Sequence, residues 1–282
     1  MTESKAIDIL KKYTRHNHVR LTSRGNIAIF IALYCARKVN GLNPVITTDS
    51  GGWITYLKYP RMLQMKVSLI ETDYSLVKLE ELREKTKDAT AFLYAQPGGY
   101  FVDQPYKEIY KICKKNKCLV IKDVSGSIGT KYCDGRYADF MVCSFGRGKP
   151  INLGYGGFVS AKEGEFFQRS KEIFNTDKFD TGSTPLLLSK LDNLKKRYNL
   201  FEEYNKKIKS DLNNFEILHK DKWGINVLVK FNNDEQKEKI INYCKTNNLP
   251  YKICRRVRDP KKNLLSFIKV NEDAISIDVQ YI

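Results

Sequence analysis

The sequence lacks any long hydrophobic run, and this absence sets the first limits on its function. No stretch of about 18 apolar residues occurs in the chain, and residues 1–12 have no apolar centre of the kind a signal peptide carries. We therefore expect a soluble, cytoplasmic protein that does not interact with a membrane. Because 42% of its 282 residues are hydrophobic, the chain can still bury a sizeable core.

Metal ligands and paired cysteines are scarce as well. The chain has three histidines and seven cysteines, and no Cys-x-x-Cys pair. An odd number of cysteines, most of them within apolar runs, favours reduced core residues over a disulfide framework. Cys113 and Cys118 could form half of a metal site, but no second cysteine pair accompanies them. We expect neither disulfides nor a bound metal.

Acidic residues are few relative to basic ones. The chain has 32 Asp and Glu against 49 Lys and Arg, which gives a net charge of +17. Such an excess suits an anionic partner, such as a phosphate, a nucleotide or a nucleic acid. Many of the lysines, however, fall on segments expected to be solvated helix faces, residues 111–117, 195–196 and 206–209. Nucleic acid is therefore the less favoured partner, and an anionic small molecule the favoured one.

The apolar pattern of the first 184 residues predicts alternating helices and strands. We expect helices at residues 5–18, 25–37, 53–65 and 106–115, and strands at residues 45–48, 67–70, 91–94, 119–121, 140–143 and 157–160. Alternation of this kind is typical of a mostly parallel sheet covered on both faces by helices, where ligands bind beyond the carboxyl ends of the strands. We predict an α/β large domain over residues 1–184.

The remainder, residues 185–282, predicts a long connecting helix and a small α/β domain. Ser183, Thr184 and Pro185 form a strong helix start, since Ser and Thr cap helices and Pro favours the first helical position. Apolar residues then recur at helical spacing to about residue 213. Beyond the helix we expect a strand at 225–231, a helix at 234–247, and strands at 251–255, 264–270 and 274–279.

Two residues near the ends of predicted strands indicate a pyridoxal phosphate site. Asp123 closes the apolar run of residues 119–123, and Lys149 lies in the glycine-rich segment 144–157. Pyridoxal 5'-phosphate needs an amine to bond to its aldehyde and a carboxylate to keep its pyridine nitrogen protonated. We predict that Lys149 and Asp123 are the catalytic pair. A lysine in a glycine-rich loop, taken alone, would be an ordinary solvated turn residue.

The spacing around this pair resembles that of the DegT/DnrJ/EryC1/StrS sugar aminotransferases, a branch of the fold-type I pyridoxal phosphate enzymes. The resemblance extends from about Leu21 to the C-terminus. It rests on residues at the family's offsets, namely Asp123, Gly129, Ser144, Phe145, Lys149, Ile151, Gly154, Gly156 and Gly157. It implies a fold-type I large domain with a small C-terminal domain, a homodimer, and amino transfer from an amino acid to a keto-sugar that we expect to be linked to a nucleotide.

The resemblance assigns cofactor roles to several further residues. Gly25 and Asn26 open a predicted helix at the position of the family's phosphate cradle, where free N–H groups and the positive helix end favour an anion. Trp53, after a double glycine, corresponds to the aromatic residue that stacks on the cofactor ring, although a core anchor would show the same pattern. Ser144 corresponds to the hydroxyl that binds the phosphate.

The chain departs from the family's sequence pattern at two places, one expected to contact the cofactor and one expected to contact the partner subunit. Gly126 stands where the family usually has a glutamine beside the cofactor's phenolic oxygen, and Ser125 or Ser127 is the expected substitute. Residues 180–184 replace the Asn-Tyr-Arg whose asparagine reaches the neighbouring subunit's phosphate. We therefore expect a dimer in which each subunit binds the phosphate mainly through its own Gly25, Asn26 and Ser144.

The substrate and the reaction leave alternatives open. A basic cluster, Lys252, Arg255, Arg256 and Arg258, could contact a sugar diphosphate or a donor carboxylate, or could be a solvated loop. The same cofactor also supports elimination, desulfuration or a transfer on an RNA-linked substrate. A catalytically idle member that acts as a binding or scaffold protein is the third alternative. A visible absorption band of bound cofactor would separate an enzyme from a scaffold.

Overall fold

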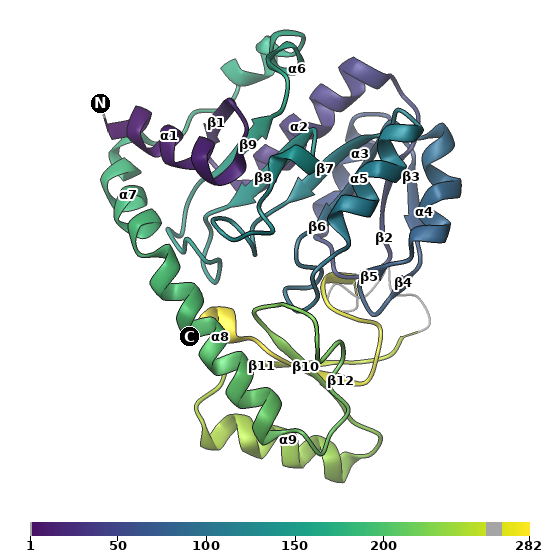
Figure 1. The fold of residues 1–282 in the computed structure, drawn as a ribbon, viewed down its shortest axis with the longest axis vertical. Coiled ribbons are helices and arrows are strands. Elements are labelled where there is room, and N and C mark those ends of the chain that lie inside the picture. Colours follow the sequence, from purple (N-terminus) through teal and green to yellow (C-terminus); the bar gives the residue numbers. More distant parts are fainter. Residues whose placement is uncertain (1, 258–266) are drawn as a thin grey trace.

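The computed structural model describes residues 2–257 and 267–282, and a seven-stranded sheet forms its centre (Figure 1). Its strands are β1 (His18–Thr22), β2 (Val45–Thr48), β3 (Val67–Ile70), β6 (Ala91–Ala95), β7 (Leu119–Asp123), β8 (Phe140–Ser144) and β9 (Gly157–Ala161). They follow the order β1-β9-β8-β7-β6-β2-β3, in which β8 to β3 are parallel and β9 and β1 pair antiparallel. The predicted mostly parallel sheet is confirmed.

Helices cover both faces of this sheet because the side chains of each strand alternate between the two faces. They are α1 (Thr2–Thr14), α2 (Gly25–Asn40), α3 (Thr55–Met62), α4 (Leu79–Lys85), α5 (Tyr106–Lys115) and α6 (Gly164–Gln168). Leu119 and Ile121 of β7 lie in one core cluster with residues of α2 and α3, whereas Val120 lies in another with residues of α1, α4 and α5. By the same alternation, Asp123 shares the face of Ile121 and is directed toward α2 and α3.

The C-terminal part contains two consecutive helices and a second, smaller sheet. Its elements are α7 (Thr184–Asp192), α8 (Leu194–Asp211), β10 (Val227–Lys230), α9 (Asp234–Thr246), β11 (Tyr251–Cys254) and β12 (Ala274–Ile277). The small sheet is antiparallel in the order β10-β12-β11. Figure 1 shows α7 and α8 running along one side of the molecule, from the large sheet to the small one. A short hairpin of β4 (Thr72–Asp73) and β5 (Leu76–Val77) stands apart.

The structure differs from the sequence-based predictions at the ends of elements. The first helix ends at Thr14, because Arg15 adopts a left-handed φ of 58° and the chain then enters β1. The predicted long helix is interrupted at Asn193, an exposed residue whose side-chain amide donates to the Ser189 carbonyl at 2.8 Å. Arg258 and the first half of the predicted strand 264–270 lie outside the described residues, and residues 267–270 are not in a strand.

Membrane-spanning helices, clusters of metal ligands and exposed thiols are absent from the described residues. No helix in residues 2–257 and 267–282 combines the length and hydrophobicity needed to cross a lipid bilayer. The same residues contain no group of three or more His, Cys, Asp or Glu arranged to hold a metal ion. All seven cysteines are buried and unpaired, so the thiols belong to the core as the sequence predicted.

Candidate active site

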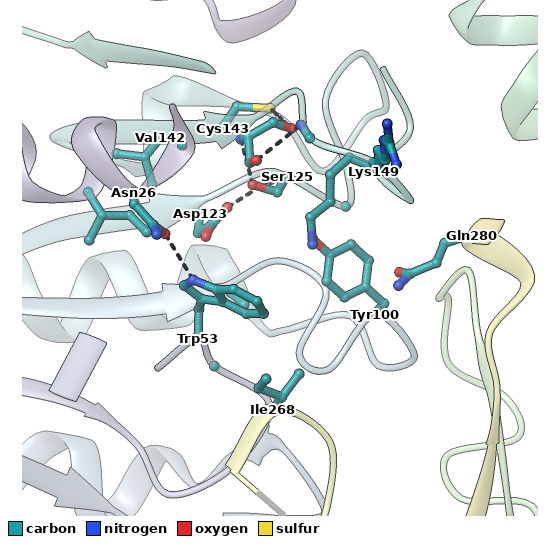
Figure 2. Close-up of a pocket in the computed structure, with 18 of the residues that line it drawn as sticks. Asn26, Trp53, Tyr100, Asp123, Ser125, Val142, Cys143, Lys149, Ile268 and Gln280 are labelled. Carbon is teal, nitrogen blue, oxygen red and sulfur yellow. Dashed lines mark hydrogen bonds between the residues drawn. The ribbon is translucent and has the colours of Figure 1, made fainter. Parts of the chain in front are cut away.

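A cavity of about 800 Å³ lies at the carboxyl ends of the parallel strands (Figure 2). Ala95, Asp123 and Ser144, the last residues of β6, β7 and β8, line it. Residues of the C-terminal part, such as Ile268 and Gln280, also line the cavity (Figure 2). Seven residues predicted to have catalytic or cofactor-binding roles line this cavity, namely Gly25, Asn26, Trp53, Asp123, Ser125, Ser144 and Lys149. The structure therefore brings these seven residues together.

The Asp123 carboxylate is held by two hydrogen bonds. The Tyr56 hydroxyl donates to Oδ2 at 2.7 Å, and the Ser125 backbone N–H donates to Oδ1 at 2.9 Å. Burial, and then the adjacent Asp123 charge, raise the pKa of Tyr56 well above its ordinary value, so this tyrosine stays protonated and donates. Gly52 lets the Tyr56 ring approach, since a Cβ there would lie 2.9 Å from Tyr56 Cδ2. The site thus presents a negative charge in a fixed direction.

Lys149 reaches the cavity from the loop that follows β8. Its Nζ donates a hydrogen bond to the Tyr100 hydroxyl at 2.6 Å and lies 5.4 Å from the Trp53 ring centroid (Figure 2). Burial lowers the pKa of Lys149 to about 8, while the Asp123 charge opposes this shift and Lys269 adds to it. At that pKa, about a tenth of the molecules carry a neutral amine at neutral pH, far more than for a free lysine.

Trp53 and Asn26 are linked to each other. The indole N–H of Trp53 donates to Asn26 Oδ1 at 2.9 Å (Figure 2). The ring is half-buried against the core formed with α2 and lines the cavity with its remaining surface. Asn26 therefore orients the indole, a role that the sequence did not predict for it. Trp53 is both a core contact and part of the cavity wall.

The start of α2 and the end of β8 form a narrow cradle. A Cβ on Gly25 would lie only 2.4 Å from the Ser144 Cβ, so the close approach requires glycine. The helix has 16 residues and no side-chain cap at its N-terminus. The Ser144 hydroxyl accepts from the Gly146 N–H at 3.2 Å, and the Ser144 N–H donates to Ser125 Oγ at 2.8 Å. An uncapped helix start beside a hydroxyl is suited to the phosphate of pyridoxal phosphate.

The two serines proposed as substitutes for a glutamine at position 126 have different surroundings. Ser125 lines the cavity and connects Asp123 to Ser144. The Ser127 hydroxyl instead donates to the Gln96 carbonyl at 2.8 Å and does not line the cavity. Of the two, Ser125 alone is placed to act on a bound cofactor.

A buried lysine of the C-terminal part, which no sequence pattern predicted, also belongs to the site. Lys269 is 2% exposed, and its Nζ donates to Asp278 Oδ1 and to the Gly99 carbonyl, each at 3.1 Å. Lys252 pairs with the same Asp278 at 3.4 Å. Both lysines line the cavity. The sequence offers no spacing signal for Lys269, because its position there depends on how the small sheet meets the large one.

The predicted basic cluster does not act as one unit. Arg256 forms an ion pair with Glu272, and Arg258 lies outside the described residues. Of the described members, only Lys252 lines the cavity. The sequence left open whether this cluster contacts a substrate or forms a solvated loop. Arg255 and Arg256 do not line the cavity, so substrate contact stays a proposal for Lys252.

The parallel sheet and the cavity with its lysine and strand-end aspartate define a pyridoxal phosphate enzyme of fold type I. A sequence model of the DegT/DnrJ/EryC1/StrS aminotransferase family matches residues 8–180. The match covers more than half of the chain, which therefore belongs to this family of pyridoxal phosphate-dependent aminotransferases. The resemblance derived from the sequence is confirmed.

Solved structures of similar fold include three in which the similarity covers most of both chains. DesI, studied in the presence of its TDP-sugar product, is 12% identical, with a TM-score of 0.76 over 98% of this chain and 79% of its own. 3-Amino-5-hydroxybenzoic acid synthase is 12% identical, with a TM-score of 0.72 over 100% and 86%. A cysteine desulfurase from Thermococcus onnurineus NA1 is 12% identical, with a TM-score of 0.69 over 98% and 78%. Identities this low show the fold alone. No curated protein sequence matches the chain.

Proposed function

We propose that this aminotransferase moves an amino group from an amino-acid donor to a keto-sugar linked to a nucleotide. The observation that carries the proposal is the presence, in one cavity, of a lysine with a lowered pKa and a carboxylate fixed by two donors, Lys149 and Asp123. The residues around this pair match what pyridoxal 5'-phosphate requires.

The proposed roles follow from the position of each side chain. Asp123 would face the pyridine nitrogen of the cofactor, Trp53 would lie against its ring, and Lys149 would bond to its aldehyde. The cradle of Gly25, Asn26 and Ser144 would hold its phosphate, and Ser125 would tie the cradle to Asp123. When bound, pyridoxal phosphate supplies an electron-poor ring that stabilises negative charge on the adjacent substrate carbon.

Lys149 is the residue proposed to move the proton. Once the donor amine displaces Lys149 from the aldehyde, its neutral Nζ would accept the proton from the amino-bearing carbon of the donor and deliver it to the aldehyde carbon of the cofactor. In the second half-reaction it would carry a proton from that carbon to the acceptor. In the cofactor-free protein, burial lowers the pKa of Lys149 to about 8, which is closer to neutral pH than the pKa of a free lysine. Asp123, held by Tyr56 and Ser125, keeps its charge directed at one point while this exchange occurs.

The charge of the cavity supports an anionic substrate. Five cationic side chains line it, and Asp123 is the one carboxylate among the described lining residues; the cations are Arg24, Arg147, Lys149, Lys252 and Lys269. A positively lined cavity attracts anions, such as a sugar diphosphate or a dicarboxylic amino acid. DesI, which shares the fold and has a TDP-sugar product, is consistent with a nucleotide-linked sugar as the anion.

Desulfuration and a scaffold role are less well supported. All seven cysteines are buried. Cys143 alone of them lines the cavity, and burial, followed by the Asp123 charge, raises the pKa of its thiol well above the ordinary value, which disfavours the thiolate that would receive sulfur. A scaffold would have no use for a half-buried lysine in the same cavity as a fixed, buried carboxylate, since both are costly to keep in the fold. The proposed amino transfer uses both groups.

The test of this function separates the two halves of the reaction. Purified protein is loaded with pyridoxal phosphate and mixed with single amino acids, and the visible absorbance of the cofactor is followed. Nucleotide-linked keto-sugars are then added, and the products are identified by mass spectrometry. We expect one donor to bleach the band and one keto-sugar to restore it with formation of an amino-sugar. Bleaching without any aminated sugar nucleotide would overturn the substrate class.

A further inference from the structure

We propose that Tyr100 is a positioning residue of this site: its ring lies in the space that Gly126 leaves, and its hydroxyl holds the Lys149 amine in the cavity. The inference rests on the proposed function, because it concerns the group that would bond to the cofactor. Tyr100 lies in the loop after β6, and β6 is the strand that pairs with β7, which ends at Asp123. It belongs to no motif in the sequence.

The contact between Tyr100 and Lys149 is direct. Lys149 Nζ donates to the Tyr100 hydroxyl at 2.6 Å and lies 4.5 Å from the centroid of its ring. Burial, and then the Asp123 charge, raise the pKa of Tyr100 well above its ordinary value, so the phenol stays protonated. It can therefore accept a hydrogen bond from the ammonium and donate one to the neutral amine. Figure 2 shows the Lys149 side chain extended toward this hydroxyl, with Gln280 on the other side of the ring.

Gly126 is what leaves room for the ring. A Cβ at this position would lie 2.9 Å from Tyr100 Cδ1 and 2.9 Å from Pro97 Cδ, distances that Cβ atoms do not adopt. Gly126 is not among the residues with a positive φ, so its backbone conformation does not require glycine. The absence of a side chain at 126 is thus accounted for by the Tyr100 ring.

The backbone of Tyr100 is fixed from the C-terminal part. Its φ of 71° is a left-handed value that a bulky residue rarely adopts, and such conformations persist where the surroundings hold them. Two N–H groups, of Ile225 and Asn226, donate to the Tyr100 carbonyl at 2.8 and 2.9 Å. Lys269 Nζ donates to the preceding carbonyl of Gly99 at 3.1 Å. The hydroxyl therefore has a defined position relative to Lys149.

Removal of this hydroxyl should alter the amine in a predictable direction. The charged and titratable groups that face Lys149 are Asp123 of β7, Cys143 of β8, Lys252 of β11, Lys269 and Tyr100. Among the described residues, Tyr100 is the one that accepts a hydrogen bond from Nζ. A bond from an ammonium is stronger than one to a neutral amine, so its loss penalises the charged form more. Without the hydroxyl, the pKa of Lys149 should fall further.

The experiment compares Tyr100→Phe, which keeps the ring, with Tyr198→Phe as a matched control. Tyr198 donates to the Gly126 carbonyl at 3.1 Å, so the control removes a hydroxyl beside the same glycine without touching Lys149. In cofactor-free protein, lysines are labelled with an amine reagent across a range of pH, and the midpoint for Lys149 is read by peptide mass spectrometry. We expect Tyr100→Phe to lower the midpoint by about half to one pH unit. Tyr198→Phe should leave it unchanged.

A second measurement follows pyridoxal phosphate uptake by absorbance in the same variants. We expect Tyr100→Phe to slow uptake roughly tenfold, because the amine is no longer held in one orientation. An unchanged midpoint together with parent-like uptake would overturn the inference, while a pyridoxyl label on Lys149 of the parent would still support the proposed function. If Tyr100→Phe does not fold, Gly126→Ala takes its place. The added methyl must displace the ring, so a parent-like midpoint in that variant would also contradict the inference.

Discussion

At the scale of single residues, the site consists of two opposite charges that uncharged neighbours hold in place. Asp123 accepts from Tyr56 and Ser125, and Lys149 donates to Tyr100. The sequence revealed the two charged residues because the cofactor's chemistry requires both a lysine and a carboxylate, and the two occur at a recognisable spacing. It did not reveal the two tyrosines, since a tyrosine near a glycine pair is common and its partner becomes evident only in three dimensions.

Asp123→Asn tests the electronic part of the account. The amide keeps the shape of the carboxylate but cannot hold a proton on the pyridine nitrogen. We expect the conversion of bound cofactor by an amino-acid donor to slow by at least roughly a hundredfold. Rapid-mixing absorbance measures this rate, and a melting curve close to that of the parent would show that the fold is retained. Conversion at the parent rate would show that Asp123 has another role.

His16 provides a test of stability against pH that does not involve the cavity. Its ring nitrogens bond Ser160 Oγ at 2.9 Å and the carbonyls of Gly135 and Ala138 at 3.0 and 3.2 Å. Burial lowers the pKa of His16 from 6.5 to about 4. Because the unfolded chain then binds the proton more tightly, the stabilisation is complete above pH 6.5 and is lost as pH falls toward 4.

The size of this effect is about 3 kcal/mol between neutral pH and a pH below the folded pKa. Urea unfolding of the parent and of His16→Gln at several pH values measures it, since the glutamine cannot titrate. The free-energy difference between parent and variant should shrink as pH falls from 6.5 to 4. A difference that is constant over this window would show that His16 does not stay neutral in the fold.

At the scale of elements, the site is built where α2 begins and where β7 and β8 end. Gly25 allows the helix start to approach Ser144, and the parallel pairing of β7 and β8 places Asp123 next to the same point. These strands and the start of α2 were predicted from the sequence, because short apolar runs and a glycine start carry a strong local signal. β1 was not predicted, since its pairing with β9 depends on contacts distant in the sequence.

Ser144→Ala tests the phosphate cradle. Loss of a hydroxyl that bonds a phosphate should weaken pyridoxal phosphate binding by about 1.5 to 3 kcal/mol, which is roughly a tenfold to hundredfold rise in the dissociation constant. Ser127→Ala is the matched control, because its hydroxyl bonds the Gln96 carbonyl and lies outside the cavity. Titration by absorbance compares them. Equal affinities for the two variants would show that the Ser144 hydroxyl does not bind the cofactor phosphate.

At the scale of the whole molecule, two sheets meet at one cavity. We propose that residues 1–184 and 185–282 are its two domains, since the large sheet lies in the first range and the small sheet in the second. The chain nevertheless returns to the cavity at its end, where Gln280 and Tyr281 line it. The sequence could not predict this return, or the burial of Lys269, because neither carries a local pattern.

The quaternary structure is a further prediction at this scale. The family resemblance implies a homodimer, and we propose that each subunit binds the cofactor phosphate mainly through its own Gly25, Asn26 and Ser144. Light scattering should give a mass of about twice the 32.7 kDa of the chain. A monomer that still holds pyridoxal phosphate would contradict the dimer while leaving the roles of these three residues intact.

The central claim is that Lys149 forms the bond to pyridoxal phosphate, and its most direct test is chemical trapping. Protein incubated with the cofactor is reduced with borohydride, digested and mapped by mass spectrometry. The account predicts one pyridoxyl group, attached to Lys149, and its loss in Lys149→Ala. A label on another lysine, or no label in the parent protein, would contradict the claim.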